Sequence, residues 1–423
     1  MQLTDQEKAM LDGREGKAVQ AAMELLYRYA KALGAERFVD VSNVLGGYMV
    51  ANVPLFKKYG DFDALISTYC LDSDCPLKIG KVKVPSFQNQ THMESNYYEI
   101  TGKTKDQLAV YKMNEAFNMN MGIQWTATCA PYQLGVTPVK GEHIAWMESS
   151  AVVYANSVLG ARTNCEGKES TTAAMLTGKI PYWGYHITEN RAGTHLIHVD
   201  CKIENSFEWG LLGYFTGKFC KGSVPVLTGI ESAPRKDYLK HFGAATASAG
   251  GVELFHIPGI TAEVNTLEEA FQGKKPVECV VFNEETMRRT YEELNFSGRD
   301  RHVDLIITGC PHYSLEELWL LAEYLGDRKI KDGVSFWIFM PAGLKEIASR
   351  QGLLRRVENA GILVMTDSCP CLGEFAPAGC RVMSTDSAKQ AHYFPNILKR
   401  ETWYGTMEQC VDAAVSGIWE GKL

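Results

Sequence analysis

The sequence predicts an α/β protein of several domains, in which helices pack against mostly parallel sheets. Short apolar runs alternate with stretches of helical periodicity along much of the 423 residues, and such alternation is typical of parallel α/β layers. No repeat of roughly 20–50 residues is visible, which argues against a solenoid. The length suggests roughly two or three domains of about 150 residues, each large enough for a core of its own.

The elements follow in order from these two patterns. Apolar runs predict strands at residues 37–41, 64–69, 81–87, 123–128, 277–282, 303–308, 335–340 and 362–366. Apolar residues three and four positions apart predict helices at residues 16–33, 105–118, 142–159, 235–249, 284–294, 314–325, 343–359 and 406–418. Gly-rich, polar stretches suggest three domains, at residues 1–130, 131–295 and 296–423.

The composition excludes several classes of function. Hydrophobic residues make up 45% and charged residues 22% of the chain, as in ordinary soluble proteins. The net charge is only -7 and no Lys/Arg stripe is present, which argues against a nucleic-acid partner. No apolar stretch approaches the ~18 residues that a membrane span needs. Thr4 and Glu7 form a capping-box pattern, so the N-terminus is expected to be a helix and not a signal peptide.

Twelve cysteines are spread along the chain. They do not form the dense array of a small secreted scaffold, so we expect a cytoplasmic protein whose thiols stay free or bind metal. Cys310 follows the apolar run 303–307, and the capping-box pair Ser314 and Glu317 sets the start of the next helix. Cys310 is therefore expected at the C-terminal tip of a strand, where open α/β sheets bind ligands. Taken alone, it could equally be a buried structural cysteine.

Cys129 and Cys369 occur in the same setting as Cys310. Each follows an apolar run and a Thr, and each is followed within two residues by Pro. We expect these three thiols to converge at one sheet edge or domain junction. Three cysteines can hold a cubane iron–sulfur cluster and leave one iron open as a Lewis acid for a substrate hydroxyl. A structural zinc site fits three dispersed cysteines poorly, and three buried thiols remain the alternative. Cys371 could replace Cys369 as a ligand.

Several long motifs occur in one order: LTDQEKAMLDGREG at the start, TCAPY at Cys129, ESSAV with YANSVLGARTN, GCPH at Cys310, TDSC at Cys369 and STDSAKQAHY near the end. With them the chain resembles the catalytic large subunit of aconitase X, a branch of the aconitase superfamily, over nearly its whole length. The resemblance implies an aconitase-like fold, with several α/β domains around a central cleft. It also implies a cluster on Cys129, Cys310 and Cys369, with 4Fe-4S favoured over 2Fe-2S or 3Fe-4S.

The resemblance further implies a hydro-lyase that removes water from a small hydroxy acid. The expected reaction converts cis-3-hydroxy-L-proline to Δ1-pyrroline-2-carboxylate, and the alternative substrate is mevalonate 5-phosphate. An alternative of another class is a non-catalytic iron–sulfur or redox-sensing scaffold. Family members carry a small swivelling domain, either fused to this chain or as a separate subunit. No such domain is recognised here, so we expect a separate small subunit that supplies the serine base.

Polar residues near these motifs are candidates for substrate binding. Arg162 follows a Gly-Ala helix break, and a guanidinium is the natural bidentate partner of a carboxylate. A surface salt bridge is the alternative. Asn164 and Glu166 could orient the substrate or a bound water, or serve a structural role. The family usually has arginine where this chain has Cys165, so its pocket is one cation short.

Four further residues complete the candidate site. Ser149 and Ser150, expected in mid-helix, could contact a ligand, although packing against a neighbouring element is the simpler role. His312 could act as the acid that helps the hydroxide to leave, or it could be a structural histidine. Lys389 could neutralise a carboxylate or phosphate, or it could be an exposed helix lysine. A cation near the carboxylate would stabilise the charge that develops when the α-proton is removed.

Overall fold

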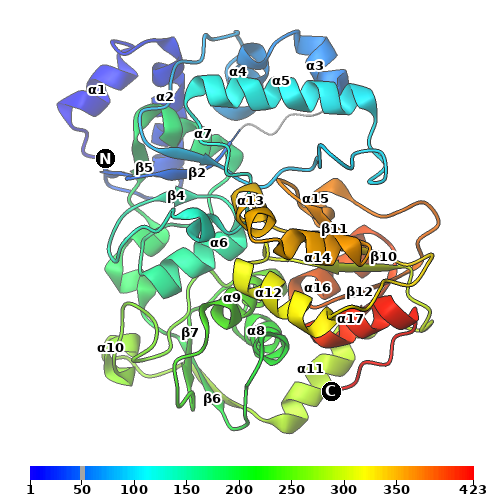
Figure 1. The fold of residues 1–423 in the computed structure, drawn as a ribbon. Coiled ribbons are helices and arrows are strands. Elements are labelled where there is room, and N and C mark those ends of the chain that lie inside the picture. Colours follow the sequence, from blue (N-terminus) through cyan, green and yellow to red (C-terminus); the bar gives the residue numbers. More distant parts are fainter. Residues whose placement is uncertain (48–52) are drawn as a thin grey trace.

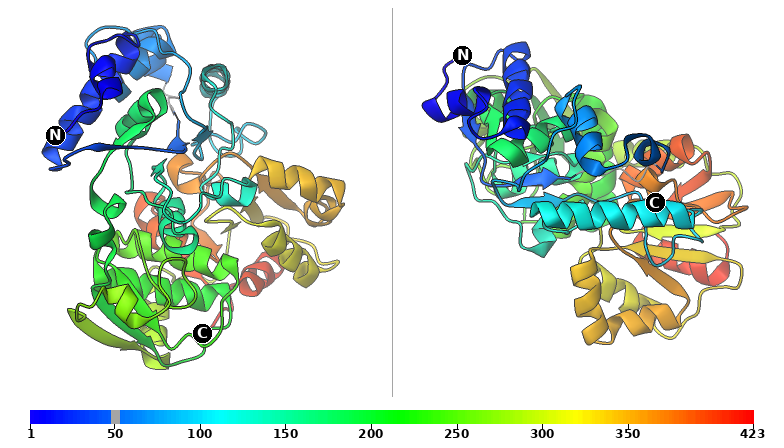
Figure 2. Two further views of the ribbon diagram at one scale, coloured as in Figure 1. Left: turned by 90° about the vertical axis from the view of Figure 1, so that its left-hand side faces the viewer. Right: turned by 90° about the horizontal axis from the view of Figure 1, so that it is seen from above.

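The structure is a computed structural model that describes residues 1–47 and 53–423. Figures 1 and 2 show three regions: an N-terminal region that is mostly blue to teal but includes the green helix α7, a middle region in green, and a C-terminal region in yellow to red. The N-terminal region contains α1 (Asp5–Leu11), α2 (Lys17–Ala32), β1 (Phe38–Asp40), β2 (Val44–Gly46), α3 (Val53–Tyr59), α4 (Phe62–Leu71), β3 (Ser86–Gln88), α5 (Lys105–Met121), η1 (Pro131–Leu134), β4 (Ala145–Trp146), α6 (Ser149–Tyr154), η2 (Ala155–Leu159), α7 (Lys168–Thr177) and β5 (Lys179–Pro181).

Two small sheets join the parts of this region. Strands β3, β2 and β4 form a parallel sheet in that order, and β1 pairs with β5 in antiparallel fashion. The predicted domain boundary at residue 130 therefore falls between strands that share a sheet. Apolar side chains of α2, α4 and α7 form one buried core beneath these strands.

The middle region has a parallel sheet in the order β7-β6-β8. Two short helices, η3 (Gly184–His186) and η4 (Thr188–Arg191), connect it to the N-terminal region. Its other elements are β6 (His195–Val199), α8 (Ser206–Cys220), β7 (Pro225–Thr228), α9 (Lys236–Gly250), α10 (Leu267–Phe271), β8 (Glu278–Phe282) and α11 (Glu284–Leu294). Helices α8 and α9 lie in close contact, because a Cβ at Gly217 would lie 2.5 Å from the carbonyl oxygen of Thr246.

The C-terminal region is a five-stranded, fully parallel sheet in the order β11-β10-β9-β12-β13. Its elements are β9 (Leu305–Thr308), α12 (Leu315–Leu325), β10 (Ser335–Phe339), α13 (Ala342–Arg350), α14 (Leu353–Asn359), β11 (Ile362–Met365), α15 (Pro370–Gly373), β12 (Val382–Thr385), α16 (Ala388–Ile397), β13 (Glu401–Tyr404) and α17 (Met407–Ser416).

Both faces of this sheet are buried, which explains why β9, β10 and β11 are almost continuous apolar runs. Ile306 and Ile338 pack with α12, α13, α14 and α17, whereas Ile307 and Phe339 point to the opposite core, which includes side chains of α16. The carboxyl ends of β9 and β11 lead directly into the segments that carry Cys310 and Cys369.

Several predicted elements are wrong in detail. Residues 64–69 lie in helix α4, because Asp61 caps its N-terminus through the amide of Ala64 and the helix is buried on nearly every side. Residues 123–128 form only an isolated bridge between Gln124 and Phe87, and Ala127 has a φ of +42°. The predicted helix 142–159 begins only at Ser149, after strand β4.

Other elements lacked a clear local pattern. The predicted helix 343–359 is two helices, because Gly352 adopts a left-handed conformation with φ +75°. Strands β6, β7, β12 and β13 and helices α7, α8 and α16 were also not predicted from the sequence. Among the described residues, no helix combines the length and apolar character needed to cross a membrane.

Candidate active site

Three segments from distant parts of the chain carry the candidate thiols. Cys129 precedes η1, Cys310 follows β9 after Gly309, and Cys369 is the N-cap of α15. Thr91 joins the N-terminal region to the third segment, because its amide donates to the Asp367 carbonyl at 2.7 Å and its carbonyl accepts from the Cys369 amide at 2.8 Å.

Cys310 lies within electrostatic reach of both Cys129 and Cys369. Burial raises the pKa of the Cys310 thiol to about 12, and the charge of Cys369 adds to this rise. Burial also raises the pKa of Cys129, with further contributions from Glu148 and Cys310. Each thiol therefore lies within electrostatic reach of another. Among the residues that the structure describes, no three His, Cys, Asp or Glu side chains are grouped to hold a single metal ion.

Cys371 contacts one member of this group. A hydrogen bond from Cys371 lowers the pKa of the Cys369 thiol, although burial opposes the effect, and the same contact raises the pKa of Cys371 well above its usual value. Cys369 is thus the member of the pair whose thiolate is stabilised.

His312 ties the three segments together. Its amide donates to Cys129 Sγ at 3.3 Å, its Nδ1 lies 3.0 Å from Thr128 Oγ1, and its Nε2 lies 2.9 Å from the Ser368 carbonyl oxygen. A carbonyl can only accept, so Nε2 carries the proton and Nδ1 accepts from the Thr128 hydroxyl. Burial lowers the pKa of His312 to about 4. The geometry favours a neutral, positioning histidine over the proton donor suggested by the sequence.

A buried ion pair lies beside the thiols. Lys389 Nζ, on the first turn of α16, is 2.8 Å from Glu148 Oε1 and 3.1 Å from Ser150 Oγ. Ser150 and Gln90 also donate to the Glu148 carboxylate. Both charged side chains are only 12% exposed. Lys389 is therefore not the exposed helix lysine that the sequence left open.

The charges of this pair act on each other and on the cysteines. Burial alone would raise the pKa of Glu148, but the Lys389 ammonium and three hydrogen bonds lower it to about 2. Burial opposes the charged form of Lys389, yet Glu148 and the neighbouring thiols raise its pKa well above the usual value. Lys389 in turn favours the thiolate forms of Cys129, Cys310 and Cys369.

A second buried network of charged side chains binds the backbone carbonyl of His312. Lys240 Nζ donates to the His312 carbonyl at 3.1 Å and pairs with Glu317. His241 Nε2 contacts the other oxygen of Glu317 at 2.8 Å. These groups lie on α9 and α12 and join the middle region to the C-terminal region. The network fixes the segment that follows Cys310.

The remaining predicted residues lie in other surroundings. Arg162 Nη1 donates to the His186 carbonyl at 2.9 Å and to Thr188 Oγ1 at 2.8 Å. Asn164 Oδ1 accepts from the Tyr185 amide at 2.8 Å. Both side chains thus contact the η3–η4 segment. Glu166 is buried, and burial raises its pKa to about 7.

The structure therefore brings Ser150 and Lys389 to the cysteines, together with His312. Ser149 and Ser150 are the first residues of α6 rather than mid-helix residues, and Ser149 is half-buried. Glu148 and Gln90 were not among the residues predicted from the sequence. Glu148 directly precedes α6, but nothing in its local pattern distinguishes it from an ordinary polar residue at a helix start.

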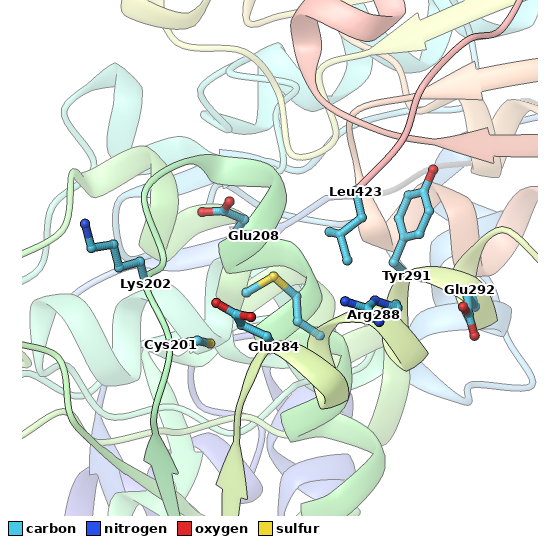
Figure 3. A pocket seen from close by; sticks show the side chains of 9 residues that line it. Cys201, Lys202, Glu208, Glu284, Arg288, Tyr291, Glu292 and Leu423 are labelled. Carbon is cyan, nitrogen blue, oxygen red and sulfur yellow. The ribbon is translucent and has the colours of Figure 1, made fainter.

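A separate pocket of about 550 Å³ lies away from the predicted residues (Figure 3). It is formed by α11, by the connection from β6 to α8, and by the C-terminal residue. Its lining residues are Cys201, Lys202, Glu208, Glu284, Met287, Arg288, Tyr291, Glu292 and Leu423. None of the candidate site residues lines it.

Comparisons with known proteins agree with this architecture. Family models for the first, second and third domains of aconitase X match residues 1–189, 193–292 and 303–416. The crystal structure of Thermococcus kodakaraensis aconitase X in its holo form superposes with a TM-score of 0.81 at 29% sequence identity, and covers 98% of this chain and 100% of that one. The predicted aconitase-like α/β fold is thereby confirmed.

Two curated relatives indicate the class of reaction. The phosphomevalonate dehydratase large subunit of Methanocaldococcus jannaschii is 35% identical, over 97% of this chain and 99% of its own length. The cis-3-hydroxy-L-proline dehydratase of Hypocrea jecorina is 34% identical, over all of this chain and 70% of its own length. Both relatives are dehydratases. The chain belongs to the aconitase X family and is a dehydratase, that is, a hydro-lyase.

Proposed function

We propose that this chain is the cysteine-bearing large subunit of an iron–sulfur dehydratase that acts on a small hydroxy acid. The proposal is supported by the position of Cys129, Cys310 and Cys369, which all lie within electrostatic reach of the buried Glu148–Lys389 pair. A set of buried thiols beside a fixed cation fits an iron–sulfur cluster, because soft thiolates bind iron–sulfur centres and their charge needs compensation. When bound, the cluster would supply a Lewis acid for the departing hydroxyl.

The residues of the chain would then position the substrate and control charge. Lys389 is held by Glu148 and Ser150, and its ammonium would stabilise negative charge that develops on the substrate during loss of the α-proton. The proton leaves to a base, for which we propose a serine of a small partner subunit, and the hydroxide leaves from the neighbouring carbon with a second proton. Arg162 remains a candidate for the substrate carboxylate, because its Nη1 alone makes the hydrogen bonds described above.

We propose cis-3-hydroxy-L-proline as the first substrate to test. Its dehydration would give an enamine that tautomerises to Δ1-pyrroline-2-carboxylate. Mevalonate 5-phosphate is the second candidate, favoured by the end-to-end match with a phosphomevalonate dehydratase large subunit. A large subunit implies a small one, and we propose such a partner for this chain.

The test is anaerobic co-expression of the chain with its small subunit, followed by assays on both substrates. Cys129→Ser, Cys310→Ser and Cys369→Ser should each lose iron and activity. Cys410→Ser is a control, since Cys410 is also a buried thiol but lies in the core of the C-terminal region. Equal iron retention in the three variants and the control would refute the ligand set.

A spectroscopic measurement separates catalysis from a non-catalytic iron–sulfur scaffold. If a bound cluster takes part in catalysis, its electronic or paramagnetic spectrum should change when substrate is added, because the cluster would act on the substrate hydroxyl directly. An unchanged spectrum with no turnover of either substrate would favour the scaffold.

A further inference from the structure

The carboxyl groups of Glu166 and Glu253 form a pair beside Cys165, next to the candidate active site. Cys165 is exposed, and it is bridged to Trp146 on β4, two residues before Glu148. Its Sγ donates to the Met147 carbonyl at 3.4 Å, and its amide donates to Glu253 Oε2 at 2.9 Å. Cys165 thus connects the Glu148–Lys389 pair on one side with Glu253 on the other.

The charges around Cys165 are mostly negative. Glu253, Glu148 and Glu166 all act electrostatically to raise the pKa of its thiol, and Lys389 opposes them. Lys389 is already paired with Glu148. Within residues 1–47 and 53–423, no Lys, Arg or His forms an ion pair with Glu166 or Glu253.

Glu166 has an unsatisfied atom in this environment. Its side chain is buried, the residue being only 9% exposed, and its Oε1 has no hydrogen-bond partner among the described residues. Glu253 lies close enough to raise the pKa of Glu166 further after burial, and burial raises the pKa of Glu253 itself. One oxygen of this buried carboxyl therefore lacks a hydrogen bond. An unsatisfied buried oxygen is unfavourable, and a bound cation would relieve that cost.

We propose that Glu253, backed by Glu166, binds a positively charged nitrogen of the substrate. This inference rests on the proposed function and narrows its substrate class to amino acids with a protonated amine. An ammonium group offers charge-assisted donors to a carboxylate. A phosphate group would instead bring two negative charges toward three carboxyl groups and one paired cation, which is unfavourable. The same charges that attract hydroxyproline would therefore disfavour a phosphorylated acid.

The test uses two ligands that differ at one atom. L-Proline and cyclopentanecarboxylate share a five-membered ring and a carboxylate, but only L-proline carries the ring ammonium. Binding of each to the holo complex of both subunits is measured by calorimetry. We expect L-proline to bind at least tenfold more tightly, and Glu253→Gln or Glu166→Gln to reduce that ratio toward one.

Kinetics give a second readout on the same variants. Loss of one charge-assisted hydrogen bond should raise KM for cis-3-hydroxy-L-proline roughly ten- to a hundredfold, with a smaller change in kcat. Glu253→Asp should recover part of the loss, which a purely structural defect would not allow. Glu231→Gln, at an exposed position, is the matched control and should leave both constants unchanged.

The outcomes separate this inference from the proposed function. Equal binding of the two ligands to the wild-type complex, or an unchanged KM in both Gln variants, overturns the inference while dehydration stands. Turnover of mevalonate 5-phosphate in preference to hydroxyproline also overturns it, again without touching the dehydratase. If the loaded complex dehydrates neither substrate, the proposed function falls, and the L-proline comparison still decides whether the carboxyl pair binds an ammonium.

Discussion

Among single residues, Glu148 and Lys389 dominate the electrostatics of the candidate site. They lie 241 residues apart in sequence and form a buried pair that Ser150 and Gln90 complete by hydrogen bonds. Breaking a buried ion pair on one side is costly because the remaining charge stays out of water. Replacing both partners by neutral groups removes that penalty.

Lys389→Met should therefore destabilise the apoprotein by about 3–5 kcal/mol. The double variant Lys389→Met/Glu148→Gln should recover most of the loss, because no buried charge is left unpaired. Urea unfolding of the two variants and the wild type at neutral pH provides the measurement. Equal stability of the single and double variants would contradict the pairing.

The Glu148–Lys389 pair also makes the stability of the folded protein depend on pH in the acid range. The folded state lowers the pKa of Glu148 from 4.5 to about 2, so its contribution to stability is fully present above about pH 4.5. It is lost as pH falls through about 2. The contribution is about 3 kcal/mol at neutral pH, since one pKa unit corresponds to about 1.4 kcal/mol. Acid unfolding of wild type and Glu148→Gln should converge at low pH; parallel curves would argue against this assignment.

His312 has no free nitrogen for proton transfer. Because Nε2 donates to the Ser368 carbonyl and Nδ1 accepts from Thr128, we expect the kcat profile of the holo complex to show no limb near pH 6.5. With the pKa of His312 lowered to about 4, the imidazole stays neutral above that pH. A rate that falls as pH rises through 6.5, and loses this dependence in His312→Gln, would restore its role as the acid.

Among secondary-structure elements, the turn from β9 into α12 fixes the place of Cys310. Gly309 has φ +90°, and a Cβ there would lie 2.1 Å from the Phe339 carbonyl oxygen. Phe339 ends the neighbouring strand β10, so the close approach holds the two strand ends together. Ser314 then caps α12 by accepting from the Glu317 amide at 3.1 Å.

Gly309→Ala should be strongly destabilising and should reduce iron retention, because it combines backbone strain with a clash that moves the Cys310 segment. Gly333→Ala is the matched control. Gly333 has a similar φ of +86°, but nothing lies within 4 Å of the position that the alanine methyl group would occupy. The free energy of unfolding of Gly333→Ala should fall only by the energy of backbone strain, about 1 kcal/mol. Comparable losses in thermal stability and iron content for both variants would refute the steric argument.

For the whole molecule, the site depends on contacts between all three regions. Cys129 comes from the N-terminal region and Cys310 and Cys369 from the C-terminal region, and Lys240 of the middle region supports the His312 peptide. All three regions therefore contribute to the surroundings of the candidate thiols. Under the proposed function, the serine base would come from a partner subunit.

We accordingly expect the purified chain to bind iron but to show little turnover of cis-3-hydroxy-L-proline. Adding the small subunit should restore activity and saturate at a fixed stoichiometry, because each large subunit would need one base. Steady-state assays across a titration of the partner provide the measurement. Full activity from the large chain alone would contradict this division of roles.

Local patterns were sufficient to predict part of this structure. Apolar runs predicted β9, β10 and β11, and the capping box of Ser314 predicted the start of α12. They failed at residues 64–69, since an apolar run buried on all sides can be a helix as well as a strand. The motifs around Cys129, Cys310 and Cys369 carried the resemblance that the family models confirm.

The sequence by itself determined the α/β class and the capped strand–turn–helix at Cys310, because both depend on patterns among neighbouring residues. It also determined membership of the family, because the motifs that the family shares are contiguous. Only the tertiary structure decided the surroundings of those thiols. Glu148 meets Lys389, and His312 meets Thr128 across 184 residues. A hydrogen bond or buried ion pair requires two side chains about 3 Å apart, and that distance is set by how the three regions pack, which no local periodicity records.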